Sequence, residues 1–291
     1  MAVLRKALLI MIAALSSYLG GQTPAGAIDL MTPTEPVPQG EVVLISIKDL
    51  PPNARVKGFW QGDTSEFFEL EDGKYGSLLG IDLRLKPGTY PLKITVKSGE
   101  DRPLTLRTTL EVVAKDYGVQ RLTLPENMVN LNPETLERVR KEGARFSELW
   151  HKQSPERYWQ GNFVRPVPGE LTTPFGLRRI LNEEPRSSHS GVDLRAAVGE
   201  PVRSANHGRI VLEGEFYFHG KAVVIDHGWG IYTMYFHLSQ VNVSVGEFVE
   251  KNAVIGLAGS SGRATGPHLH WGVRLGGARV DPLALLRVTG E

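Results

Sequence analysis

Short runs in which apolar and polar residues alternate recur through most of this chain. Leu92, Ile94 and Val96 alternate with lysine and threonine, and residues 104–112 repeat the pattern. A period of two places the apolar side chains on one face of an extended strand. Asp-Gly and Pro-Gly pairs between such runs supply the turns of antiparallel hairpins. The pattern therefore predicts a mostly β protein with little room for helices.

The composition limits the number of domains and the chemistry. A length of 291 residues favours about two domains. The formal net charge of +1, with no run of basic residues interleaved with aromatics, does not indicate a nucleic-acid partner. The absence of cysteine excludes disulfides, thiolate metal sites and a cysteine nucleophile. Any metal ion must therefore be held by histidine, aspartate or glutamate.

The first 27 residues have the pattern of a signal peptide. Arg5 and Lys6 precede an apolar stretch at 7–19, and Ala25-Gly26-Ala27 matches the small-residue cleavage pattern. The alternative is an uncleaved anchor, for which the apolar stretch is short. We expect cleavage, an exported protein in the periplasm or at the cell wall, and no stable membrane span afterwards.

The sequence pattern divides the remainder of the chain into four segments. Residues 28–40 are rich in proline and predict an extended lead-in. Residues 41–118 predict a small β-sandwich whose strand spacing is immunoglobulin-like. Residues 119–165 predict a linker with a helix over about 133–153, because Asn132-Pro133 is a typical helix start. Residues 166–291 return to strands and turns and predict a second, antiparallel β domain.

Residues able to bind a metal or transfer protons gather in that last domain. His268 and His270 share a face if their segment is a strand. His189 and Asp193 lie four apart, and His237 ends a strand-like run. A catalytic zinc takes three protein ligands, which His189, Asp193 and one of the first pair would supply, and the spare histidines could handle protons. The helical HExxH zinc motif is absent, so the pattern alone indicates a His/Asp metal site.

Three segments resemble the signatures of the lysostaphin-type (LytM-like) zinc metallopeptidases. They are HSGVDL at 189–194, YFHLS at 235–239 and GPHLH at 266–270. Shorter matches occur at 173–178, 224–228, 254–256 and 280–283, in the order and spacing of the family across roughly 167–286. The N-terminal half resembles the immunoglobulin-like accessory β domain that some secreted members carry.

The resemblance implies roles for the matching residues. His189, Asp193 and His270 would bind one zinc ion per chain, and His237 and His268 would form the catalytic pair. The implied activity is that of a metalloendopeptidase that hydrolyses peptide bonds in the stem peptides or cross-links of bacterial peptidoglycan.

Two other functions compete with this one. Some relatives are non-catalytic and bind the cell wall or activate another wall hydrolase, but all five polar positions are intact here. A metal-storage protein would not need two histidines beside three ligands. Peptidoglycan is the expected partner, and a regulatory protein is a second candidate because the β domain and the helix could cover the groove.

The predicted roles of several neighbouring residues are less specific. In a regular strand Tyr235 would share the face of His237, where we expect it to pack. Trp271 alternates away from the paired histidines and is predicted to be core, and His227 is predicted to be structural. Arg178 and Asn182 precede the first ligand and either touch substrate or brace the loop.

Overall fold

The computed structural model describes residues 28–100, 102–123, 125–150 and 152–290, so the predicted signal peptide lies outside the described residues. These residues form two compact units. The N-terminal unit comprises the described residues up to Val37, with Val43–Leu79 and Pro87–Val113. The C-terminal unit comprises Pro38–Val42, Gly80–Lys86 and the chain from Ala114 onward. The mostly β character predicted from the alternating pattern is confirmed in both units.

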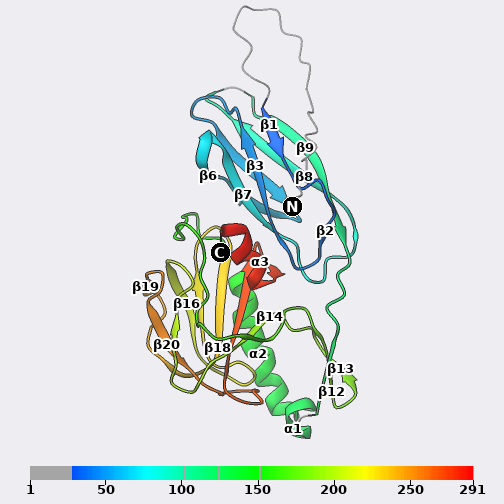
Figure 1. Cartoon of the computed structure of the whole chain (residues 1–291), viewed down its shortest axis with the longest axis vertical. Coiled ribbons are helices and arrows are strands. Elements are labelled where there is room, and N and C mark those ends of the chain that lie inside the picture. The colour runs from blue at the N-terminus through cyan, green and yellow to red at the C-terminus, as the bar shows by residue number, and fades with distance from the viewer. Residues whose placement is uncertain (1–27, 101, 124, 151, 291) are drawn as a thin grey trace, which may run out of the picture. The chain divides into compact units, whose positions relative to one another are not determined.

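Two sheets form the N-terminal unit (Figure 1). One has the order β1-β3-β7-β6, with β1 (Asp29–Met31), β3 (Val42–Lys48), β7 (Tyr75–Gly80) and β6 (Phe68–Glu69). The other has the order β2-β9-β8-β4-β5, with β2 (Val37–Pro38), β9 (Leu104–Val113), β8 (Gly88–Lys97), β4 (Arg55–Trp60) and β5 (Asp63–Glu66). Ile45 and Ile47 from the first sheet and Ile94 from the second are fully buried. The immunoglobulin-like character of this unit stays a prediction.

A large antiparallel sheet dominates the C-terminal unit. Its main path is β11 (Leu171–Thr173), β14 (Gly191–Arg195), β21 (His268–Leu275), β18 (Ile231–Val241), β17 (Gly220–Asp226), β16 (Gly208–Phe216) and β19 (Phe248–Val249). Three further strands pair alongside that path: β15 (Pro201–Arg203), β20 (Val254–Ala258) and β22 (Ala278–Val280). The central strands are long and almost wholly buried, so they hold the residues that project from them in fixed positions.

A smaller sheet connects the start of the C-terminal unit to this core. In it β10 (Val119–Leu122) runs parallel to β12 (Arg178–Leu181), which pairs antiparallel with β13 (Glu184–Pro185). The segment predicted as a linker therefore contributes a strand that pairs with the segment leading to His189.

Three α-helices occur among the described residues: α1 (Glu126–Val129), α2 (Pro133–Trp150) and α3 (Pro282–Thr289). The longest, α2, begins as the sequence predicts, because the Asn132 side chain accepts a hydrogen bond from the Thr135 amide at 2.8 Å. No helix in the described part of the chain is long and apolar enough to cross a membrane.

Helix α2 packs against the large sheet through Phe146, its buried aromatic residue. The Phe146 ring lies 4.9 Å from that of Phe216 and 5.8 Å from that of Phe236. The buried cluster around this contact comprises Phe146, Leu212, Phe216, Ala222, Val224, Tyr232, Met234 and Phe236. The helix therefore covers the face of the sheet to which Phe236 belongs.

Candidate active site

Strand register brings the predicted ligands together. In the β14–β21 pair Asp193 lies opposite His270, and Arg195 lies opposite His268. In the next pair Phe236 of β18 lies opposite His270. Because residues directly opposite in adjacent strands project to the same face, Asp193 and His270 meet on one side of the sheet.

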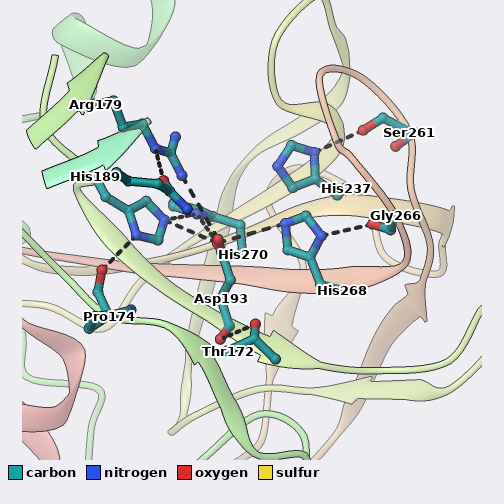
Figure 2. Close-up of polar contacts among 11 residues, drawn as sticks. Thr172, Pro174, Arg179, His189, Asp193, His237, Ser261, Gly266, His268 and His270 are labelled. Carbon is teal, nitrogen blue, oxygen red and sulfur yellow. Dashed lines mark hydrogen bonds and ion pairs between the residues drawn. The ribbon is translucent and has the colours of Figure 1, made fainter. Parts of the chain in front are cut away.

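Three ligand atoms converge on one point (Figure 2). His189 Nε2 lies 3.0 Å from Asp193 Oδ1 and 3.0 Å from His270 Nδ1, and the last two atoms are 2.9 Å apart. Tetrahedral zinc with bonds of about 2.0 Å separates its ligand atoms by roughly 3.3 Å. The triangle is therefore close to the size that a zinc ion requires.

The proton positions also favour a cation at this point. His189 Nδ1 donates to the Pro174 carbonyl at 2.8 Å, so in the neutral ring Nε2 carries a lone pair. That lone pair faces a carboxylate oxygen, Asp193 Oδ1, which also only accepts. Two acceptors 3.0 Å apart repel unless a proton or a metal ion lies between them. The donor set of two imidazoles and one carboxylate fits the three protein ligands of a catalytic zinc.

Electrostatics keep these residues in the forms that bind a metal. Burial alone would raise the pKa of the Asp193 carboxyl, but its contacts with His189 and His270 lower that pKa well below its usual range. Burial lowers the pKa of His270 to about 3. At neutral pH the cluster therefore holds a carboxylate and a neutral imidazole, and neither must lose a proton for metal to bind.

The other two predicted histidines lie beside the triangle. The ring centroids of His237 and His268 are 4.9 Å apart. His237 Nδ1 donates to the Ser261 carbonyl and His268 Nδ1 to the Gly266 carbonyl, each at 2.8 Å. Both rings are therefore fixed with Nε2 as the nitrogen available for proton transfer, and His268 Nε2 lies 3.7 Å from Asp193 Oδ1. Burial lowers the pKa of His237 to about 4, so its ring is neutral at neutral pH.

A β-bulge aims His237 at the site. Val223 pairs with Tyr235 and Lys221 with Leu238, so two residues of β18 lie opposite one residue of β17. His237 takes a left-handed backbone with φ of 64°. Bulges of this kind redirect side chains next to active sites. The bulge brings His237 beside His268.

The expectation that Tyr235 shares the face of His237 is wrong. Tyr235 lies opposite Trp271, whose side chain is fully buried on the face away from the ligands, as predicted. The Tyr235 hydroxyl accepts from the Ala205 amide at 2.9 Å, so its role there is packing and hydrogen bonding. His227 is fully buried and contacts the His207 carbonyl and the Thr233 hydroxyl, which agrees with the predicted structural role.

Two features next to the candidate ligands were not predicted from the sequence. Gly191 lies against His270, and a Cβ added there would be 2.7 Å from His270 Nε2. The Phe236 ring stacks on the His270 imidazole, with centroids 5.4 Å apart and planes 2° from parallel. The sequence marked Gly191 and Phe236 only by their places inside the family segments at 189–194 and 235–239.

A third missed residue is Arg179. Its Nη2 lies 3.8 Å from Asp193 Oδ2, and its Nε donates to the Gln120 side chain at 3.2 Å. The sequence indicated Arg178 and Asn182 instead. Arg178 is exposed and lies 4.0 Å from Asp116, and the Asn182 amide donates to Glu126. Asn182 therefore braces the segment before the site, while Arg179 contacts Asp193 of the candidate metal-binding triangle.

Comparison with known proteins identifies the family. Residues 187–282 match the model of peptidase family M23. A crystal structure from Pseudomonas aeruginosa described as an M23 peptidase superposes with a TM-score of 0.68 and 30% identity, over 88% of this chain and 96% of that one. The chain belongs to peptidase family M23, the family of the predicted resemblance.

Curated relatives match over the C-terminal region. DD-carboxypeptidase/endopeptidase Mpg of Neisseria meningitidis is 39% identical over 121 residues, which are 42% of this chain and 28% of that protein. Peptidoglycan DD-endopeptidase ShyA of Vibrio cholerae is 38% identical over 114 residues, or 39% of this chain and 26% of that protein. The chain thus spans little more than a quarter of the length of these relatives.

Proposed function

We propose that this protein is an exported zinc metalloendopeptidase that hydrolyses peptide bonds in the stem peptides or cross-links of peptidoglycan. Membership of family M23 supports the peptidase reaction. The relatives named as DD-endopeptidases support the substrate. The observation that carries the proposal is the triangle of His189, Asp193 and His270 with two oriented histidines beside it.

In this proposal His189, Asp193 and His270 hold one zinc ion per chain. Bound zinc would polarise the scissile carbonyl and lower the pKa of a water molecule towards about 7. Further hydrogen bonds position these residues: the Pro174 carbonyl accepts from the His189 ring, and the Thr172 hydroxyl donates to the main-chain carbonyl of Asp193 at 3.0 Å. Such outer contacts orient ligands before a metal binds.

The catalytic pair would move the protons. His237 and His268 each have Nδ1 tied to a carbonyl, so each can take or release a proton only at Nε2. Since the His237 ring is neutral at neutral pH, its Nε2 can accept a proton from the attacking water. The same nitrogen, once protonated, can donate to the developing charge on the substrate oxygen or to the leaving amine.

Burial protects the reaction from bulk water. The His189 side chain is 0% exposed and the Asp193 side chain 10%, whereas the His268 side chain keeps 16% of its surface open. The substrate would therefore approach from the side of His268. A dry site also strengthens each electrostatic contact within it.

The test compares zinc content and cleavage in purified chain 28–291. We expect about one zinc per chain and new muropeptide fragments in mass spectrometry of digested peptidoglycan. His270→Ala is expected to lose the metal, because two remaining ligands bind zinc weakly. His237→Ala is expected to keep the metal and lose turnover.

Each outcome separates the alternatives. Bound zinc without any muropeptide fragment would favour a non-catalytic wall-binding protein or an activator of another hydrolase. A His270→Ala variant with the zinc content of the wild type would contradict the ligand assignment. Export and periplasmic or cell-wall location rest on the sequence pattern of residues 1–27, and fractionation of cells producing the tagged full chain tests them. A regulatory partner stays a prediction.

A further inference from the structure

The tip of the hairpin between β16 and β17, residues 217–219, lies beside His237. The His219 carbonyl accepts a hydrogen bond from the His237 amide at 2.9 Å. The centroid of the His219 ring also lies 4.4 Å from that of Phe236, which stacks on the His270 imidazole. The hairpin tip therefore contacts the backbone of one candidate catalytic residue and the aromatic ring beside one candidate zinc ligand.

The same hairpin is bonded to the residue that orients the His237 ring. Lys221, the second residue of β17, donates its amide hydrogen to the Ser261 hydroxyl at 2.8 Å, and the Ser261 carbonyl accepts from His237 Nδ1. The amide and the ring of His237 are thus held by the hairpin itself and by a residue bonded to it. Because His237 has a left-handed backbone, with φ of 64°, its position depends on such contacts.

Helix α2 also holds the hairpin tip. Glu142 Oε2 accepts a hydrogen bond from the Tyr217 amide at 2.8 Å, and Glu142 Oε1 accepts from Arg138 Nε at 2.7 Å. The Glu142 side chain is only 14% exposed, so water competes little for its oxygens. A hydrogen bond to a carboxylate is shorter and about twice as strong as one between neutral groups. Glu142 is therefore a strong link between the helix and the tip.

The helix contacts the tip a second time through Phe146, one turn beyond Glu142. The centroid of the Phe146 ring lies 4.7 Å from that of His219. Both ends of the tip are therefore in contact with α2. This helix lies outside residues 187–282, which match the family model, and within the segment that the sequence pattern predicts as a linker. A helix from the predicted linker thus reaches the hairpin that holds a candidate catalytic residue.

We propose that Glu142 is a positioning residue for the peptidase reaction. By holding the Tyr217 amide it fixes the hairpin tip, and the tip fixes His237 through the His219 carbonyl. This inference rests on the proposed function and adds to it a residue from the segment before the matched region. The candidate zinc ligands lie on β14, on β21 and just before β14, so loss of the link is expected to impair turnover without releasing the metal.

The experiment uses the mature chain 28–291 loaded with zinc and a purified cross-linked muropeptide dimer. Glu142→Met keeps the approximate length of the side chain and removes the acceptor. Because a misplacement of about 1 Å can slow a reaction on the order of a hundredfold, we expect kcat to fall about ten- to a hundredfold. We expect KM to stay within about twofold and the zinc content to match the wild type. Glu142→Gln, whose amide oxygen still accepts from the Tyr217 amide, should keep kcat within about threefold of the wild type.

Glu137→Met is the matched control. Glu137 lies on the same helix and pairs with Arg140 at 2.8 Å, but its side chain is 45% exposed. This variant loses an ion pair of α2 and should keep the kcat of the wild type. Hydrogen exchange followed by mass spectrometry gives a second readout. Peptides that contain residues 217–219 and His237 should exchange faster in Glu142→Met than in Glu137→Met.

The outcomes separate a positioning role from a general structural one. A Glu142→Met variant with the kcat and the exchange of Glu137→Met would overturn the inference. Loss of folding in Glu142→Met, parallel losses of kcat and bound zinc, or equal losses of kcat in Glu142→Met and Glu142→Gln would show a structural role and overturn it as well. Circular dichroism and zinc content are therefore recorded for every variant.

The wild type separates this inference from the proposed function. Cleavage by the wild type, with equal rates in all variants, would refute the positioning role and leave the peptidase function standing. No cleavage by the zinc-loaded wild type would refute the proposed function, and the positioning role with it.

Discussion

A single methyl group at Gly191 is expected to weaken metal binding. Gly191 is the first residue of β14 and lies opposite Gly272, beside the His270 ring. Its backbone is not left-handed, so alanine introduces no conformational strain and the effect is steric. The new Cβ would lie 2.5 Å from the Trp271 carbonyl oxygen and 2.7 Å from His270 Nε2.

The distances give the size of the effect. Ordinary contact begins near 3.4 Å, so the carbonyl must withdraw by about 0.9 Å and the imidazole by about 0.7 Å. Metal–ligand distances tolerate only about 0.2 Å. In the metal-free protein the His270 ring can turn away from the new methyl group. In the metal-bound protein the ring must keep its position, so the steric strain remains. Overpacking of this kind costs about 1–3 kcal/mol, which corresponds to zinc binding about 5–150-fold weaker.

The assay is competition for zinc against a chromogenic chelator, with thermal unfolding of the metal-free proteins measured in parallel. Gly266→Ala is the control, since its Cβ would meet nothing within 4 Å although it lies two residues before His268. We expect Gly266→Ala to match the wild type in zinc affinity. Equal affinities in Gly191→Ala and Gly266→Ala would refute the argument that space beside His270 sets the geometry of the site.

Two further predictions concern the support of the site. Burial lowers the pKa of His227 to about 4, below its unfolded value of about 6.5, so the unfolded state binds more protons as pH falls. The metal-free protein should therefore lose stability between pH 6.5 and 4. In denaturant titrations, His227→Gln should reduce the slope of the unfolding free energy against pH by the equivalent of up to one proton. An unchanged slope would contradict this prediction. Phe146→Ala should destabilise the protein by about 3–5 kcal/mol and lower turnover, because the ring supports Phe236 behind His270. Leu136→Ala, at a 57% exposed position of the same helix, should change stability by less than about 0.5 kcal/mol, and equal losses in both variants would exclude a specific role for Phe146.

Local periodicity was sufficient to predict part of the site. The alternation of β21 placed His268 and His270 on one face and Trp271 on the other, and the structure agrees. The pairing of Asp193 with His270 joins residues 77 positions apart. Such register depends on how two distant strands align, which no local pattern in either strand specifies. The resemblance to a family supplied that pairing in advance.

The position of Tyr235 shows where periodicity fails. Counting by two assumes a regular strand, but the extra residue at the bulge reverses the faces beyond it. His237 lacks the backbone freedom of glycine, so its left-handed conformation with φ of 64° has a conformational cost. The sequence around it gives no sign of that conformation. Tertiary contacts offset that cost: the His237 amide donates to the His219 carbonyl at 2.9 Å, and its ring to Ser261. Strain of this kind at a candidate catalytic residue is consistent with a geometry selected for function.

The short segment before α1 shows a second limit of local patterns. Val119–Leu122 has four residues and no strong alternation, yet it pairs in parallel with Arg178–Leu181. Parallel pairing requires a partner far along the chain, so a four-residue strand of this type has almost no sequence signature. Its Gln120 side chain binds Arg179, which in turn contacts Asp193. The contacts that support the candidate ligand Asp193 therefore begin at Gln120, well before the start at residue 166 that the pattern predicts for the peptidase domain.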